Sequence, residues 1–245
     1  GRVSAAELQG IMDRIRSRVE VQQVQAAFEI RRLTKTSSRN RRHLSAIEPL
    51  VLMLRSGSSQ SAEAAILGLL NLAVKDERNK ISIVEAGALK PMIICLASPD
   101  ADLQGYATAA LYTLSASSVN KARISASGAI PLLIRVLENG SQQAKIDAIA
   151  TLYNLSTITD NLRTVLSLRP IPPLISFLKT CKKSSKTAEK CCALLESLVG
   201  FDEGRTALTA EEGGVLAVVE ILEEGSLQSR EHAVGALLTL CERSK

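Results

Sequence analysis

The sequence predicts an all-α solenoid, because one pattern of about 40 residues recurs along the whole chain. One complete copy spans residues 120–156, where a short, a medium and a long apolar segment are separated by Gly128 and by the polar residues 138–141. The leucine that closes the long segment recurs in steps of 39 to 43 residues, at Leu33, Leu72, Leu114, Leu155, Leu198 and Leu240. Repeats of this length consist of two or three helices, and their layers share one continuous core. We therefore expect about five three-helix repeats.

The composition fits such a core and excludes several other classes. Of the 245 residues, 46% are hydrophobic but 2% are aromatic and none is Trp, so Leu, Ile, Val and Ala must fill the core. No uncharged apolar run reaches the length of a membrane span, so we expect no stable membrane insertion. The five cysteines have no metal-ligand spacing. Their odd number without a disulfide framework favours a reducing compartment, which predicts a cytoplasmic and/or nuclear protein.

The first residues predict a capping helix over residues 1–20. Ser4 and Glu7 have the spacing of a capping box, and apolar residues follow at helical spacing from Leu8 to Val19. A terminal helix of this kind gives a stack of repeats one polar outer face. We expect a single domain over residues 1–245, with the cap at 1–20 and the repeats at 21–245.

Each repeat has similar residues at its helix boundaries. An asparagine such as Asn79 or Asn120 begins the short helix, and we expect its side-chain oxygen to cap the first turn. Gly204 replaces this asparagine in the last repeat. A left-handed residue then ends the short helix. This closing glycine is Gly87, Gly128 or Gly213, and Arg169-Pro170 stands in its place once. A proline such as Pro49 or Pro91 stands near the start of the second helix, where its missing N–H costs little.

The residue pattern of the repeats resembles that of armadillo repeats. The segments NKISIVEAGALKP (79–91), GAIPLLIRVLENGS (128–141) and ALLTLCERS (236–244) are similar to those of plant U-box–armadillo proteins and their armadillo-only relatives, over about residues 20–245. The resemblance implies a right-handed superhelix whose third helices line a concave groove for partner proteins. In U-box members a separate domain recruits the ubiquitin-charged enzyme, and the repeats recruit the substrate or regulator. This chain contains no U-box-like segment, so any ligase role belongs to another part of the polypeptide.

The resemblance also indicates which residues face the groove. Armadillo proteins that bind extended peptides use an Asn just before the recurring leucine, with a Trp one turn earlier. Here the Asn row includes Asn71 and Asn154 but otherwise differs, and the Trp row contains no Trp. With positions one turn later, the expected partner-binding groove consists of Phe28, Arg32, Asn71, Lys75, Thr113, Asn154, Ile158, Ser197, Phe201 and Thr239.

These differences from the peptide-binding armadillo pattern argue against a nuclear-import adaptor. A groove for basic signals needs aromatic shelves for lysine stems and carboxylates for their ammonium groups, and both are missing from these rows. Two alternatives stay open for individual residues. Asn71 and Asn154 either bind a partner or bond neighbouring segments, and Phe28 and Phe201 are either anchors or core residues. We expect Tyr112 and Tyr153, at a position shared with leucines, to belong to the core.

Basic residues gather at the N-terminal end and in a lysine-rich stretch of the fourth repeat. They form an expected secondary patch of Arg39, Arg41, Arg42, Lys182, Lys183 and Lys186. The stretch is either a mobile solvated loop or a contact for an acidic partner or an anionic membrane. We expect no nucleic-acid partner, because the basic residues are not interleaved with stacking aromatic residues.

No residue pattern in the chain indicates chemistry, so we expect no catalytic residue, no metal site and no cofactor. His43 and His232 lie far apart in the array, and no nucleophile has an activating histidine nearby in the sequence. The sequence therefore predicts a non-catalytic scaffold that binds a peptide or helix of a partner such as a kinase, a ligase substrate or a pathogen effector. The alternative is attachment to an anionic membrane or acidic partner through the basic residues. The oligomeric state does not follow from the sequence.

Overall fold

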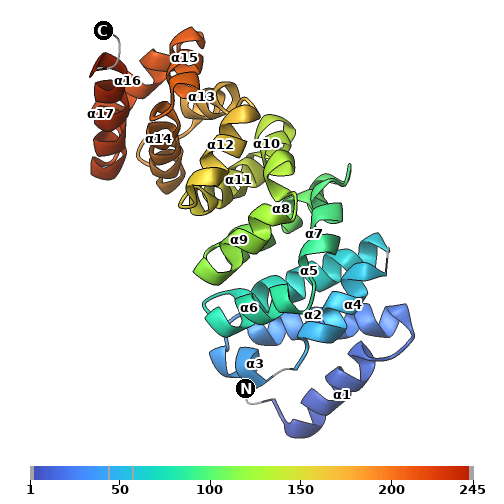
Figure 1. Cartoon of the computed structure of the whole chain (residues 1–245). Helices are drawn as coiled ribbons and strands as arrows, with labels where there is room; N and C mark the ends of the chain where they lie inside the picture. Colours follow the sequence, from blue (N-terminus) through green and yellow to red (C-terminus); the bar gives the residue numbers. More distant parts are fainter. Residues whose placement is uncertain (1–2, 44, 57, 243–245) are drawn as a thin grey trace. The chain divides into compact units, whose positions relative to one another are not determined.

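The computed structural model describes residues 3–43, 45–56 and 58–242, apart from the side chains of residues 42 and 43. Its contacts group the chain into two compact units that meet after Gly128, and each unit is described by itself. The single domain expected over residues 1–245 stays a prediction. Throughout the described residues, the regular structure is helical, without a strand (Figure 1).

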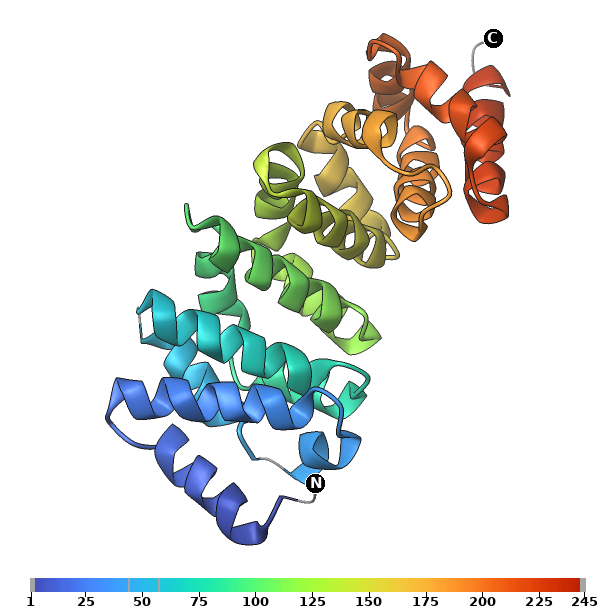
Figure 2. The same ribbon diagram turned by 180° about the vertical axis from the view of Figure 1, so that it is seen from behind.

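The first unit contains a two-helix start followed by repeats of a short, a medium and a long helix. Its helices are α1 (Ala5–Ile15), α2 (Glu20–Thr34), α3 (Ser38–His43), α4 (Ile47–Arg55), α5 (Ser59–Ala73), α6 (Glu77–Glu85), α7 (Leu89–Leu96), α8 (Ala101–Ser115) and α9 (Ser118–Ala126). The long helices α2, α5 and α8 pack side by side in that order (Figure 2). The leucines that recur at their ends are buried, which confirms the repeat register predicted from the sequence.

The second unit continues the same pattern. Its helices are α10 (Ala129–Asn139), α11 (Gln142–Leu155), α12 (Thr159–Ser167), α13 (Ile171–Thr180), α14 (Lys186–Val199), α15 (Asp202–Ala210), α16 (Gly214–Glu224) and α17 (Leu227–Glu242). The long helices α11, α14 and α17 stack on one another, as α2, α5 and α8 do in the first unit. Helices α3 to α17 thus form five three-helix repeats in chain order, as the sequence predicts.

The N-terminal helix α1 covers the outer side of α2. Its capping box forms as expected: the Ser4 hydroxyl accepts from the Glu7 amide at 3.1 Å, and the Glu7 carboxylate accepts from the Ser4 amide at 2.8 Å. Arg14 on α1 donates two hydrogen bonds of 2.8 and 2.9 Å to the Glu29 carboxylate on α2. A bidentate pair of this kind fixes orientation as well as distance, so it sets how the cap sits on the first long helix.

The predicted left-handed glycines close the short helices. Gly87, Gly128 and Gly213 have φ angles of 87°, 86° and 68°. Arg169 occupies the equivalent position with a φ angle of 57°, a conformation that favours glycine. The second helix of the first repeat begins at Ile47 rather than at Pro49, so this proline occupies the third helical position.

The asparagines of the short helices do not cap them, which corrects the sequence-based prediction. The cap of α6 is Asp76, whose carboxylate accepts from the Asn79 amide at 3.0 Å. The Asn79 side chain instead turns back and donates to the carbonyl of Leu72 at 3.0 Å and to that of Arg41, one repeat earlier, at 3.1 Å. These asparagines therefore connect three helix ends rather than stabilise one first turn.

The same bonds recur in the other repeats. Asn120 donates to the carbonyls of Leu114 and Lys80 at 3.1 and 3.0 Å, and Asn161 donates to that of Leu155 at 2.8 Å. In the last repeat Arg205 performs this role by donating to the Val199 carbonyl at 3.0 Å. Gly204 lies so close to the preceding helix that a Cβ there would be 2.0 Å from a backbone oxygen, which explains the missing asparagine.

Candidate protein-binding surfaces

Each unit presents the exposed side of its long helices, and the predicted groove residues divide between the two units. The first unit holds Phe28 and Arg32 on α2, Asn71 on α5, Lys75 just after α5, and Thr113 on α8. The second unit holds Asn154 on α11, Ile158 before α12, Ser197 on α14, Phe201 before α15, and Thr239 on α17. Whether these residues bind a partner stays a prediction, and the contacts below determine what each can offer.

The polar row comprises the residues just before the recurring leucines: Arg32, Asn71, Thr113, Asn154, Ser197 and Thr239. Three of its hydroxyls already donate within their own helices. Thr113, Ser197 and Thr239 donate to the carbonyls four residues earlier at 3.1, 3.1 and 2.9 Å. Because a hydroxyl has one proton, these side chains can offer a partner only acceptor lone pairs unless they rotate. The polar row therefore suits a partner that brings hydrogen-bond donors.

Asn71 uses part of its amide to join two neighbouring long helices. Its Nδ2 donates to the Arg31 carbonyl, in the last turn of α2, at 2.8 Å. The side chain is nevertheless half exposed, so its oxygen can still accept. Local bonding and partner binding are thus compatible at this position.

The floor row comprises the residues five positions before the recurring leucines: Phe28, Leu67, Ala109, Ala150, Ala193 and Gly235. Four of the six have at most one side-chain carbon, so the surface between neighbouring long helices is low there. Of the other two, Leu67 is buried, whereas Phe28 has 43% of its surface exposed in the first unit. This exposure argues against a core role for Phe28 and leaves it available to a partner.

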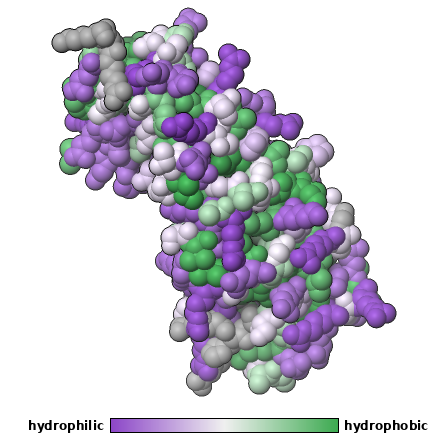
Figure 3. Space-filling view, in the orientation of Figure 1, coloured by the Kyte–Doolittle hydropathy of each residue, from purple (hydrophilic) through white to green (hydrophobic). Residues whose placement is uncertain are grey.

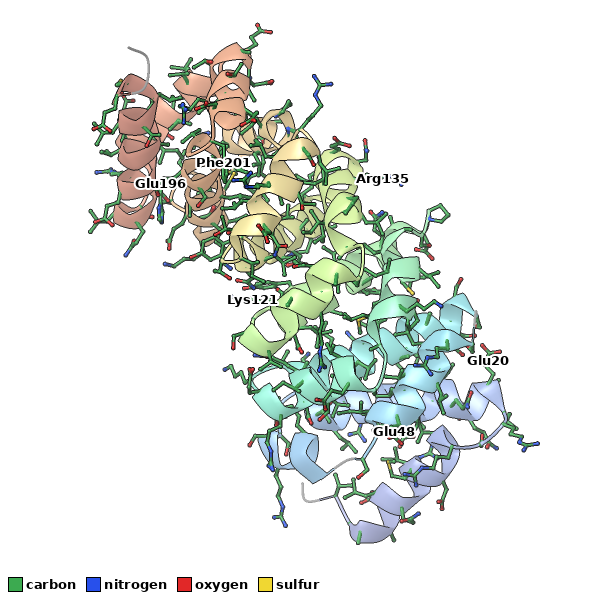
Figure 4. All side chains as sticks on the ribbon, viewed as in Figure 1. Glu20, Glu48, Lys121, Arg135, Glu196 and Phe201 are labelled. Atoms are coloured by element: carbon green, nitrogen blue, oxygen red, sulfur yellow. The ribbon has the colours of Figure 1, made fainter. Side chains whose placement is uncertain are left out.

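A carboxylate–imidazole pair that sequence reasoning did not find lies on the second unit. Glu196 of α14 and His232 of α17 are 2.7 Å apart, measured from Oε2 to Nδ1 (Figure 4 labels Glu196). Gly235 makes room for this pair, because a Cβ on Gly235 would lie 1.9 Å from the Glu196 carboxylate. Two residues 36 positions apart meet because the long helices stack side by side. The repeat length could have indicated this contact.

Two aromatic predictions for the second unit have different outcomes. Tyr153 was expected in the core but is 36% exposed on α11, so that prediction is wrong. Phe201 is half-buried, and the Arg163 guanidinium of α12 lies over its ring, 5.6 Å from the centroid. This cation–π contact partly covers Phe201, which therefore offers a partner less apolar surface than Phe28 does.

The expected secondary basic patch is smaller in the structure than in the sequence. Arg41 is buried and donates to the Thr34 carbonyl at 2.7 Å, so it does not belong to an exposed patch. Lys183 is also buried, donates to the Leu178 carbonyl and lies 3.9 Å from the Glu220 carboxylate. The exposed members are Arg39, Lys182 and Lys186, and the Arg42 side chain lies outside the described residues.

Burial accounts for the perturbed groups of the second unit. Desolvation raises the pKa of the Asp147 carboxyl, opposed by the Gln143 side-chain amide and by the charge of Lys190. Burial also raises the pKa of the Cys192 thiol to about 12, which makes it an unreactive core residue.

Among the described residues, no group of His, Cys, Asp and Glu side chains could hold a metal ion. None of the described helices is long and apolar enough to cross a bilayer.

Comparison with known proteins decides the family. A family model described as the plant U-box protein ARM repeat region matches residues 7–245. The chain belongs to this family. The armadillo region is also 43% identical over 56 residues to U-box domain-containing protein 2 of Arabidopsis thaliana. That match covers 23% of this chain and 8% of the relative's length.

Solved structures confirm the armadillo fold of the chain. A designed armadillo repeat protein superimposes with a TM-score of 0.81 at 19% identity, over 96% of this chain and 100% of that one. Another, in complex with the peptide (KR)4, gives a TM-score of 0.78 at 18% identity, over 96% of this chain and 99% of that one. At these identities the similarity extends to the fold alone. The armadillo repeat is a non-catalytic scaffold, as the sequence analysis expects for this chain.

Proposed function

We propose that the long-helix faces of this armadillo region bind partner proteins without catalysing a reaction. Exposed apolar side chains on the long helices support this most directly, one of them (Tyr153) one turn from the floor-row residue Ala150 on α11. Phe28 is 43% exposed in the first unit, and Tyr153 is 36% exposed in the second. A low floor next to such side chains lets an apolar group of a partner pack close to the helix backbones.

The polar row limits the chemistry of that partner. Thr113 in the first unit and Ser197 and Thr239 in the second offer acceptor oxygens, since their protons are engaged within their own helices. An extended segment has backbone N–H groups that can donate to such oxygens, whereas a helix has already used most of its own. The preferred partner is therefore an extended segment that combines an apolar side chain with free backbone donors.

The designed relative that carries the peptide (KR)4 provides a useful contrast. In this chain the floor row contains no Trp to hold lysine stems, and the Glu196 carboxylate already contacts His232. A peptide of alternating Lys and Arg should therefore bind weakly. This expectation separates a protein-binding scaffold of this kind from a nuclear-import adaptor.

The proposal can be tested with peptides selected by phage display on the whole chain. Dissociation constants of selected peptides are measured by fluorescence polarisation, with (KR)4 as the negative probe. We expect Phe28→Ser or Asn154→Ala to weaken selected peptides about tenfold, as loss of one interface anchor does. Leu52→Ser is the matched control, because Leu52 is 63% exposed but lies on the second helix α4.

The outcome is read together with folding. All three variants should keep the helical circular dichroism of the parent and a melting temperature within a few degrees of it. If the selected peptides bind both long-helix variants as tightly as they bind the parent, the long-helix faces are not the partner surface. A similar loss with Leu52→Ser would point to the second helices instead.

In a longer protein, we propose that this region recruits the substrate or regulator of a plant U-box ubiquitin ligase, or acts as an armadillo-only regulator. The family match supports this assignment. A full-length transcript identifies which form exists. For a U-box form, ubiquitin transfer to a bound partner should depend on Phe28 or Asn154, while transfer without that partner should not. If both substitutions leave ubiquitin transfer to the partner unchanged, this region does not recruit the partner.

The alternative, attachment through basic residues, has weaker support. Three of the six predicted cations are exposed. Two others are buried and donate hydrogen bonds to backbone carbonyls. Sedimentation with anionic vesicles at increasing salt tests it, because electrostatic attachment fades steeply with ionic strength. We also propose a cytoplasmic and/or nuclear location, which the unpaired state of all five cysteines supports. Fluorescent tagging of the full-length protein in plant cells checks this.

A further inference from the structure

The first unit contains a cavity of about 940 Å³ that the proposed function does not use. It lies at the edge of the unit where α4 and α7 end and α5 and α8 begin. Its apolar lining includes Leu54, Pro91, Cys95 and Leu103, which are all nearly buried. Its size is within the range of pockets that bind ligands. In the space-filling view, hydrophobic surface around α4 and α7 is bordered by hydrophilic side chains (Figure 3).

This cavity is distinct from the long-helix face of the same unit. Helices α4 and α7 lie toward the viewer in Figure 1, whereas α2, α5 and α8 lie toward the viewer in the reverse view of Figure 2. A ligand in the cavity would therefore contact neither Phe28 nor Thr113. Binding at the two surfaces can be tested separately.

Of the described residues that line the cavity, two are cations and none is an acid. Arg55, at the end of α4, donates from Nη2 to the carbonyls of Ala86 and Gly87 at 3.2 and 3.4 Å. A Cβ on Gly87 would lie 2.4 Å from this nitrogen, so the glycine permits the close approach as well as the φ angle of 87°. Lys90 is exposed on α7 and has no ion-pair partner among the described residues. The cavity is thus electropositive.

Neighbouring features add to this positive potential. The N-terminus of α5 opens at the cavity through Ser58 and Ser59, and a helix N-terminus carries a partial positive charge. The nearby carboxylate of Asp100 does not line the cavity. It accepts from the amides of Asp102 and Leu103 at 3.0 and 3.2 Å as the cap of α8. Asp100 is therefore engaged in capping a helix, and Glu63 and Asp102, which also neighbour lining residues in the sequence, do not line the cavity either.

We propose that this cavity binds a peptide segment of another protein in which an apolar side chain stands next to carboxylates. The buried lining would receive the apolar side chain, and Arg55 and Lys90 would pair with the carboxylates. Charge complementarity thus selects an acidic rather than a basic segment. Ile94 is 67% exposed at the rim, so the apolar surface continues beyond the cavity, as an extended chain requires.

The test uses a fluorescein-labelled nonapeptide with a central Leu-Phe pair and glutamates on both sides. The matched probe has the same pair flanked by lysines. On the whole chain we expect the acidic peptide to bind at least tenfold more tightly than the basic one, with an affinity that falls as salt rises. Lys90→Glu and Ile94→Asp should each weaken the acidic peptide at least tenfold. Both residues are exposed, so the fold should tolerate either change.

Lys182→Glu is the control, because it makes the same charge change at an exposed lysine of the second unit. It should leave the affinity for the acidic peptide unchanged. Equal losses in Lys90→Glu and Lys182→Glu would overturn the proposal, as would a failure of the acidic peptide to bind.

Two further outcomes would reassign the cavity. Displacement of the peptide by octanoate at equal concentration would indicate a small apolar carboxylate instead of a protein segment. Self-association of the chain that Ile94→Asp abolishes would indicate a second copy. Peptides selected for the long-helix face should still bind the Lys90→Glu variant. A negative result for peptide binding at the cavity therefore does not contradict the proposed function. A negative result at the long-helix face likewise does not contradict the proposal for the cavity.

Discussion

Replacing Asn120 with alanine tests whether the asparagines of the short helices hold the repeats together. Asn120 is fully buried, and its amide bonds the carbonyls of Leu114 and Lys80 at 3.1 and 3.0 Å. Each such bond contributes about 1 kcal/mol net, and a buried carbonyl left without a donor costs about 1–3 kcal/mol. Because the Asn120 side-chain oxygen has no partner among the described residues, its removal recovers part of this loss. We expect Asn120→Ala to lower the free energy of unfolding by about 2 kcal/mol.

Asn120→Asp sharpens the test, because it keeps the shape and replaces the donor with a carboxylate that faces two carbonyls. It should cost more than the alanine variant, about 4 kcal/mol, because the charge is buried without a partner. Asn71→Ala is the control, since its single bond of 2.8 Å lies at an exposed site. Urea unfolding followed by circular dichroism measures all three, and hydrogen exchange should show the loss near α6, α8 and α9. If Asn120→Asp is milder than Asn120→Ala, the donor role assigned to the amide is wrong.

Three further predictions concern the second unit. Burial raises the pKa of Asp147, so the unfolding free energy falls as pH rises from below about 4 through the raised value. Asp147→Asn should be more stable than the parent at pH 7. Thermal melts should show the difference in melting temperature between the two proteins closing near pH 4. Val234→Lys should cost under about 0.5 kcal/mol at 44% exposure, whereas Ile149→Lys, fully buried at the same repeat position, should cost over about 4 kcal/mol. Equal urea midpoints would contradict this difference in burial. Gly235→Ala should change stability little, because the gain in helix propensity offsets displacement of the Glu196 side chain. The Glu196 carboxylate, freed from His232, should strengthen the binding of (KR)4 measured by fluorescence polarisation. An unchanged affinity for (KR)4 would refute the role given to Glu196.

The period of the leucines was enough to predict the helices and their grouping into repeats. Gly87, Gly128 and Gly213 adopt left-handed angles as expected, and Arg169 takes the same conformation where the sequence lacks glycine. This information is local, because the last turn of a short helix needs a particular backbone angle whatever surrounds it. Helix starts were harder to predict. Asp76 and Asn79 are both good capping residues, and the packing of the preceding repeat decides which one turns toward it.

The candidate surfaces could be predicted less well, because exposure depends on neighbours that the sequence does not place. Lys183 lies in a lysine-rich stretch that reads as solvated, yet its amine bonds the Leu178 carbonyl at the end of α13. Tyr153 shares a repeat position with leucines but is more than one-third exposed. The cavity beside Arg55 combines two turns and two helix starts about 40 residues apart. No linear pattern describes that combination.

The contacts in the two units lead to different selectivity at their long-helix faces. In the first unit, Arg32 is exposed one helical turn from the exposed Phe28, and Lys75 is exposed just after α5, so an acidic group next to an apolar anchor would be favoured there. In the second unit, the Glu196 carboxylate is engaged by His232, and the hydroxyls of Ser197 and Thr239 donate to their own helix. That face has few free charges, and its selectivity must come from shape and apolar contact. Charge changes in a partner should therefore affect binding to the first unit far more than binding to the second.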